Sequence, residues 1–175
     1  MAKTAAELMA KLAKNKDYQA RMAKKREQFA ELERIYTLDE EPLVADLNDV
    51  GFSVGAVWDF VNSDNYYLDA VPVLLKHLKI KHHPKTISGI ARSLAIKSLT
   101  GNEELWSTLI ELYRKTPSNV NIEVAAERGS QESIAVALAI LATESRVAEL
   151  ENIIKEHPNG DGMLLLKDAV KCFKS

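Results

Sequence analysis

The chain has 175 residues, 23 basic and 25 acidic side chains, and a formal net charge of −2. With 46% hydrophobic and 27% charged residues it has the composition of a globular protein, which excludes the disordered, collagen-like and fibrous classes. The single cysteine, Cys172, excludes an intramolecular disulfide, and no apolar run approaches the roughly 20 residues that span a bilayer. We therefore expect a cytoplasmic protein without a membrane segment or a signal peptide.

A long basic helix is predicted for about residues 4–36. Neither Gly nor Pro interrupts this segment, and its apolar side chains fall near one helical face: Leu8, Leu12, Tyr18, Met22, Phe29, Leu32 and Tyr36. Residues 1–36 carry a charge of +4, whereas the remaining residues carry −6. This change predicts an N-terminal basic amphipathic helix, 1–36, followed by a separate domain, 37–175.

The domain is expected to open with two short helices. Residues 37–40 have the spacing of a capping box, and Pro42 suits the first turn of a helix that should end near Gly51. Ser53 is placed to cap a second helix over about residues 54–61, before a break at residues 63–65.

Three pairs of helices are predicted in the rest of the chain. They cover about residues 66–78 and 84–97, 103–115 and 131–142, and 143–156 and 162–173. The pairs carry apolar residues at matching positions, which indicates a degenerate repeat of helical hairpins that stack around a shared core. Residues 117–130 are an insertion, and residues 122–126 are expected to add a helical turn. No segment predicts a strand, so the fold class is all-α.

The hairpins resemble HEAT repeats, whose leading helix often contains a mid-helix proline such as Pro72. Residues 87–95 keep the apolar spacing of the trailing helix, although Ser88 replaces its usual arginine. Residues 57–62, 70–78 and 89–95, with Trp106 and Tyr113, are similar to a group of small bacterial HEAT-like proteins. The resemblance covers about residues 40–172 and implies a right-handed α-α superhelix (HEAT/armadillo-like) with a binding role. It transfers no catalytic residue.

No motif predicts a metal, a cofactor or a nucleophile. His82 and His83 are adjacent and point in different directions, and His77 lies about one helix away without a tetrahedral ligand set. We interpret this segment as a polar turn. Cys172 has no activating neighbour in the sequence, and residues 159–162 lack the Lys and Ser/Thr of a phosphate loop. We therefore expect a protein that is not an enzyme.

Two tryptophans and one glycine have structural interpretations. Trp58 and Trp106 fall on apolar helical positions and are expected to pack in the core. Gly89 lies inside a helix that would favour alanine, so it predicts a close approach of neighbouring helices. If the protein were nevertheless an enzyme, such as a repair glycosylase, Trp58, Asp59 and Trp106 are the candidate residues for its cleft.

The charges alternate between the two kinds of turn. Turns inside a hairpin should lie along one edge of the stack, and they are basic: Lys76, Lys79, Lys81, His82, His83 and Lys85, then Arg114 and Lys115, then Lys155 and His157. Turns between hairpins should lie along the other edge, and they are acidic: Asp64, Asp69, Glu103, Glu104, Glu144 and Glu149. Helix dipoles alone favour this alternation, by about 0.3–1 kcal/mol for each charge. They do not explain the density of cations over residues 76–85. The candidate partner-binding surface consists of the residues of the basic turns named above except His157, together with Arg92.

Three functions fit these observations. The first is a non-enzymatic interaction module whose solenoid surface binds another protein, with an acidic partner favoured; a cognate inhibitor or immunity-type protein is one form of it. The alternative is a nucleic-acid-binding helical-repeat protein, backbone-directed or DNA-repair-like, which the basic edge favours and the net charge opposes. An enzyme is the third. The sequence leaves the oligomeric state open.

Overall fold

A computed structural model of the chain describes residues 4–61, 67–122 and 128–174. Every regular element in these ranges is helical and none is a strand, which confirms the all-α prediction. No helix in the described ranges is both long and apolar enough to cross a membrane. Contacts divide the chain into two units, Met1–Leu38 and Asp39–Ser175.

The first part of the chain forms two helices instead of the single predicted one, and the second of them is longer than predicted. Helix α1, Ala5–Lys14, and helix α2, Lys16–Asp49, replace the single helix expected over residues 4–36. They separate at Asn15, whose Oδ1 accepts the N–H of Tyr18 at 3.0 Å and so caps α2. Helix α2 then continues through Thr37, so the helix start predicted there is wrong. The Thr37 hydroxyl donates to the carbonyl of Glu33 at 2.9 Å, one turn back, instead of capping a new helix.

Helix α2 ends near Gly51, as predicted. The N–H of Phe52 donates to the carbonyl of Leu47 and the N–H of Gly51 to that of Asn48, both at 3.0 Å. Gly51 has a φ of 96°, the left-handed conformation that glycine adopts without a steric penalty. The two bonds and the glycine form a Schellman motif, which satisfies carbonyls at the helix end.

The short helix after this turn begins later than predicted. Helix α3 covers Trp58–Val61 only. The preceding turn is held by Asp59, whose Oδ2 accepts the N–H groups of Gly55 at 2.8 Å and Ala56 at 3.1 Å, rather than by a Ser53 cap. The break predicted at residues 63–65 lies outside the described residues.

All six paired helices are present. They are α4 Val71–Leu78, α5 Pro84–Ser93, α6 Glu103–Lys115, α7 Ser130–Leu141, α8 Val147–Glu156 and α9 Met163–Lys174. Short 3₁₀ helices, Leu68–Ala70 and Glu144–Arg146, replace the predicted first turns of α4 and α8. Pro72 therefore lies in the first turn of α4, so the mid-helix kink expected from the HEAT resemblance is wrong. Of the residues 122–126, over which an extra helical turn was predicted, all but the first lie outside the residues that the structure describes.

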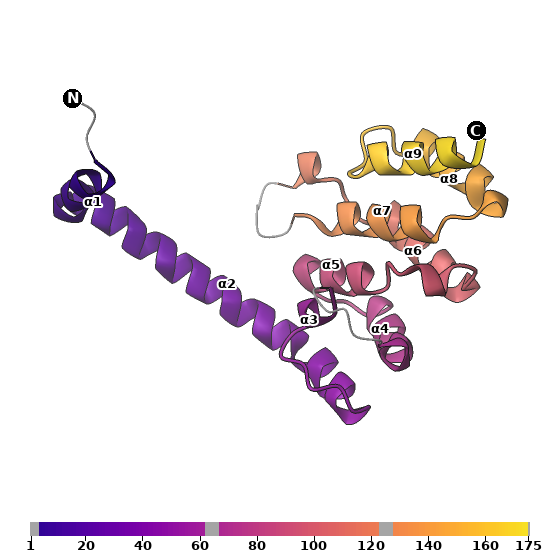
Figure 1. Ribbon diagram of the computed structural model, residues 1–175, viewed down its shortest axis with the longest axis horizontal. Coiled ribbons are helices and arrows are strands. Elements are labelled where there is room, and N and C mark those ends of the chain that lie inside the picture. The colour runs from indigo at the N-terminus through magenta and orange to yellow at the C-terminus, as the bar shows by residue number, and fades with distance from the viewer. Residues whose placement is uncertain (1–3, 62–66, 123–127, 175) are drawn as a thin grey trace. The chain divides into compact units, whose positions relative to one another are not determined.

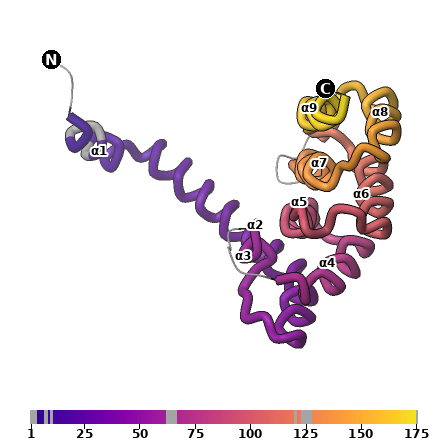
Figure 2. Tube along the Cα trace, turned by 45° about the vertical axis from the view of Figure 1, so that its right-hand side comes forward, coloured from indigo at the N-terminus to yellow at the C-terminus, as the bar shows by residue number. Residues whose placement is uncertain are grey.

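The paired helices form two layers (Figures 1 and 2). Helices α5, α7 and α9 lie side by side in one layer, with α4, α6 and α8 in the other. Helix α7 packs against α5, α6 and α9, while α4 packs against α5 and α8 against α9. Fully buried leucines fill the space between the layers: Leu74, Leu94, Leu109, Leu138, Leu150 and Leu166. Leu43 and Leu47 of α2 are equally buried.

The predictions for the aromatic residues and for Gly89 agree with this core. Trp106 is buried, and Trp58 is half-buried against the core. A Cβ atom on Gly89 would lie 2.3 Å from Cγ1 of Val57, so the backbone of α5 approaches the start of α3 as closely as predicted.

Candidate functional site

The turns that join the paired helices border two adjoining hollows of the surface. One has a volume of about 440 Å³ and lies beside the α4–α5 turn, with Lys81, Pro84 and Ile87 among its lining residues. The other has a volume of about 320 Å³ and lies beside the α8–α9 turn, where His157 and Asn159 line it. Residues 115–117, after α6, line both hollows. The two hollows are referred to together as the turn groove.

The two ends of the turn groove differ in chemistry. The larger hollow is lined by apolar side chains, including Ile87, Leu112 and Ile122, and by Lys81 and Lys115. The smaller hollow is lined mainly by polar groups, namely Arg114, Ser118, Asn121, Gln131, Glu156 and His157. An apolar side chain would fit the first hollow, whereas hydrogen-bonding groups would fit the second.

Buried polar contacts hold the floor of the smaller hollow in place. Gln131 is 2% exposed, and its amide nitrogen donates to the carbonyl of Thr116 at 2.7 Å while its amide oxygen accepts the N–H of Asp161 at 2.8 Å. The Tyr113 hydroxyl donates to the carbonyl of Asp161 at 2.9 Å. Burial, followed by the nearby Asp161 carboxylate, raises the pKa of Tyr113 to about 12. These bonds join α6 and α7 to the α8–α9 turn.

Several cations of the predicted basic edge are paired with carboxylates. Lys76 bonds to Asp46 at 2.5 Å, and Arg114 makes two bonds to Glu156, at 2.7 and 3.2 Å. The hydrogen bond from Arg114 is the main reason that the pKa of Glu156 lies below its usual value. Lys115 pairs with a carboxylate one turn earlier, Glu111. Exposed pairs of this kind stabilise a fold by only about 0–1 kcal/mol, but they reduce the positive potential of the surface.

The predicted separation into a basic and an acidic edge is wrong at one point. Lys79, placed on the basic edge, forms an ion pair with Glu104, placed on the acidic edge. Lys79 follows α4 and Glu104 lies in the first turn of α6, so the end of one leading helix meets the start of the next.

The remaining candidate residues are distributed over different environments. Lys81 is exposed at the turn groove and makes no ion pair within the described part of the chain. Arg92 is half-buried, with Nε 3.4 Å from the Ser133 hydroxyl. Lys155 lines a different hollow, between α8 and α9. The turn groove therefore brings together Lys81, His82, Arg114 and Lys115 from the predicted set and leaves Arg92 and Lys155 apart.

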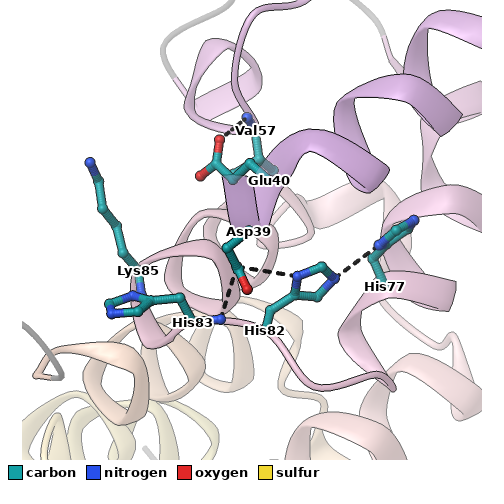
Figure 3. A network of polar contacts seen from close by, with 7 residues as sticks. All are labelled: Asp39, Glu40, Val57, His77, His82, His83 and Lys85. Atoms are coloured by element: carbon teal, nitrogen blue, oxygen red, sulfur yellow. Dashed lines mark hydrogen bonds and ion pairs between the residues drawn. The ribbon is translucent and has the colours of Figure 1, made fainter. Parts of the chain in front are cut away.

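His82 and His83 point in different directions, as predicted, and both rings make contacts within the domain. The Nδ1 atom of His83 accepts the N–H of Lys85 at 3.1 Å and so caps α5. The imidazole of His82 is only 4% exposed and faces the interior of the domain (Figure 3).

A chain of four polar side chains runs behind this turn, and the sequence reasoning missed it. The Nδ1 atom of His77 lies 2.9 Å from Nε2 of His82, and each ring contacts a carboxylate of α2. His77 Nε2 lies 2.9 Å from Asp46, and His82 Nδ1 lies 3.3 Å from Asp39. Figure 3 shows Asp39 bound to both the His82 ring and the backbone N–H of His83. The available signal was the seven-residue spacing of Asp39 and Asp46, which places both on one helical face.

Glu40 lies next to this chain of contacts. Its burial is the main reason that its pKa is raised, and the N–H of Val57, which donates to Glu40 at 3.3 Å, acts in the opposite direction. Glu40 thereby joins α2 to the segment before α3 (Figure 3).

The residues considered for an enzyme have other partners. Trp106 donates its indole N–H to Glu149 at 2.6 Å, and the guanidinium of Arg146 lies 4.5 Å from its ring centre. The Asp59 carboxylate accepts the backbone N–H groups of Gly55 and Ala56 in the turn that precedes it. In the part of the chain that the structure describes, no group of three or more His, Cys, Asp or Glu side chains is arranged to hold a metal ion.

No protein-family model matches the chain, and none of the curated proteins or solved structures is significantly similar to it. The structure itself shows an all-helical protein over the residues that it describes. The likeness to HEAT repeats remains a prediction from the residues.

Proposed function

We propose that the unit of residues 39–175 is a HEAT-like, right-handed α-α superhelix that binds another protein without catalysing a reaction. The observation that carries this proposal is the turn groove, because the turns of three successive hairpins border it together. Stacked hairpins in general present extended surfaces of this kind to their partners. A cognate inhibitor or immunity-type protein would use such a surface in this way.

The chemistry of the groove favours an acidic segment with an apolar residue. Lys81 and Lys115 lie at the margin of the larger hollow, where carboxylates of a partner would meet them. The apolar floor between them would take one aliphatic or aromatic side chain as an anchor. The polar hollow next to it would receive the backbone amides of the following residues. A short, extended peptide is therefore the partner that we propose.

Peptide binding to the whole chain tests the proposal. The probe is a fluorescent synthetic peptide with one leucine between runs of glutamate, and fluorescence anisotropy measures its affinity. We expect Lys81→Glu to weaken binding by about tenfold, or about 1.4 kcal/mol, mainly through slower association at low salt. Replacement of the peptide leucine by glycine should also weaken binding, because the apolar hollow would lose its anchor.

Lys97→Glu is the matched control. It makes the same charge change at an exposed lysine that lines neither hollow, and it should leave the affinity unchanged. Equal binding to wild type and Lys81→Glu would contradict the assignment of the groove. Binding of duplex DNA with a steep salt dependence would instead support the nucleic-acid alternative.

A further inference from the structure

His77 and His82 are buried titratable groups that the proposed peptide binding does not use. We infer that their two imidazoles share one excess proton, and that this proton holds the α4–α5 turn against the C-terminal part of α2. The shared proton lies between His77 Nδ1 and His82 Nε2, which are 2.9 Å apart. The imidazoles are only 2% and 4% exposed, so water does not replace this contact.

The three contacts of the two rings need three N–H groups, whereas two neutral imidazoles have only two. A carboxylate only accepts, so His77 Nε2 must carry a hydrogen toward Asp46, and His82 Nδ1 must carry one toward Asp39. A neutral imidazole has a single N–H. Two neutral rings would therefore direct two lone pairs at each other across 2.9 Å. A hydrogen bond forms at this distance only when one of the rings is an imidazolium.

The carboxylates at both ends keep their role as acceptors. Hydrogen bonds from Lys76, and then from His77, lower the pKa of Asp46, so it stays ionised. The same oxygen of Asp39 that faces His82 also accepts the N–H of His83 at 2.9 Å. Neither carboxylate is thus placed to supply the missing hydrogen.

The carboxylates in contact with the rings favour a positive charge on the pair. Asp46 lies 2.9 Å from His77 Nε2, and Asp39 lies 3.3 Å from His82 Nδ1. An imidazolium in this pair therefore faces a carboxylate at each end, and an opposite charge nearby stabilises the charged form of a group.

The shared proton makes the contact between the α4–α5 turn and α2 depend on both rings. Loss of either imidazole removes one contact to a carboxylate of α2 and leaves the other ring without its partner.

The same proton would regulate the turn groove. His82 lines the larger hollow together with its neighbours Lys81 and Pro84, so release of His82 displaces one wall of that hollow. This step rests on the proposed function, whereas the shared proton does not. Peptide binding should accordingly weaken in His82→Gln.

Nuclear magnetic resonance of the full chain with ¹⁵N-labelled histidine tests the inference. At about pH 7.5, where an ordinary histidine is mostly neutral, we expect His77 and His82 to show one imidazolium between them and an N–H protected from exchange. His82→Gln should abolish both signals and leave His77 as the neutral ring with hydrogen on Nε2. His157→Gln, which changes a histidine outside the pair, should leave both signals in place.

Two neutral rings in the wild-type spectrum would overturn the inference. This outcome is measured on the wild-type protein, so it does not depend on whether a variant folds. Equal unfolding midpoints of wild type and His82→Gln would overturn the claim that the proton holds the turn against α2. Peptide binding separates the two proposals. A shared proton without peptide binding at any pH contradicts only the proposed function, and peptide binding without a shared proton contradicts only this inference.

Discussion

Lys81, His82 and His83 are consecutive in the chain and have three different roles. Lys81 is exposed at the groove, His82 is bonded to His77 behind it, and His83 caps α5. An irregular turn directs successive side chains to different sides of the backbone, and that is why three residues of similar charge do not form one surface. The roles follow from which N–H groups and carboxylates the turn brings close to each ring.

Gly89→Ala should destabilise the domain. The added Cβ would meet Val57 Cγ1 at 2.3 Å, and such overpacking costs about 1–3 kcal/mol, which exceeds the gain of about 1 kcal/mol in helix propensity. Urea denaturation followed by circular dichroism measures the change. Gly55→Ala is the control, since its Cβ would have only an ordinary contact at 3.8 Å, with Asp59. Equal stability of wild type and Gly89→Ala would show that Val57 can move aside.

Tyr113→Phe should lose one buried hydrogen bond, to the Asp161 carbonyl, which costs about 1 kcal/mol at neutral pH. The pKa of Tyr113 is raised to about 12 in the fold, above its value of about 10 in the unfolded chain. The advantage of wild type over the variant is therefore fully present below about pH 10 and is lost as the pH rises toward 12. Unfolding free energies of both proteins as a function of pH measure it. A constant difference up to pH 12 would contradict the buried, neutral phenol.

At the scale of single elements, α2 differs most from its sequence prediction, because it continues as one helix through Thr37 and Pro42. Pro42 lies inside it and has no N–H to donate to the carbonyl of Leu38. The boundary between the two units falls directly after Leu38. The carbonyl of Leu38, the last residue of the first unit, therefore receives no hydrogen bond from residue 42.

Pro42→Ala should stabilise the domain. An interior proline costs about 3 kcal/mol relative to alanine, and the greater freedom of the unfolded variant offsets up to about 1 kcal/mol, so we expect a gain of about 2 kcal/mol. Thermal melting with helix content from circular dichroism provides the measurement. Glu41→Ala, at the neighbouring exposed position, should change stability by less than about 0.5 kcal/mol. A loss of stability in Pro42→Ala would mean that the proline ring contributes packing of its own.

At the scale of the whole molecule, the two units differ in burial as well as in charge. The buried residues of α2 are Glu40, Leu43 and Leu47, all of which belong to the unit that begins at Asp39. The part of α2 before Leu38 contributes no buried side chain among the residues described. The core of the second unit therefore depends on the end of α2 and not on its beginning.

A chain that starts at Thr37 should fold cooperatively, because it retains Leu43 and Leu47, each of which is 0% exposed. Circular dichroism and thermal melting test this, and a melt without a cooperative transition would show that the first helices are integral to the fold. A chain that starts at Phe52 is the contrast. It lacks both leucines, and removal of a buried leucine side chain costs about 2–5 kcal/mol, so two such losses approach a total stability of about 5–15 kcal/mol.

The sequence by itself determined the helical class, the six paired helices and the close approach at Gly89. The helices depend on neighbours within a few residues, through the spacing of apolar side chains and the residues at helix ends. The lack of a Cβ atom on Gly89 indicated that another segment comes close, and the tertiary structure shows that this segment contains Val57. The same local reasoning was wrong at Thr37 and at Pro72, because a hydroxyl can bond within a helix as well as cap one, and a preceding 3₁₀ turn shifted the start of α4.

Only the tertiary structure decided the polar contacts of the candidate site. His77 and Asp46 are 31 residues apart, His82 and Asp39 are 43 apart, and Arg114 and Glu156 are 42 apart. A charged side chain can bond to many partners of opposite charge, and the packing of distant helices selects one of them. The charge pattern therefore indicated a basic edge, whereas the fold paired Lys76, Lys79, Arg114 and Lys115 with carboxylates and left Lys81 exposed at the groove. Burial and pairing are properties of the assembled helices and not of the segments that form them.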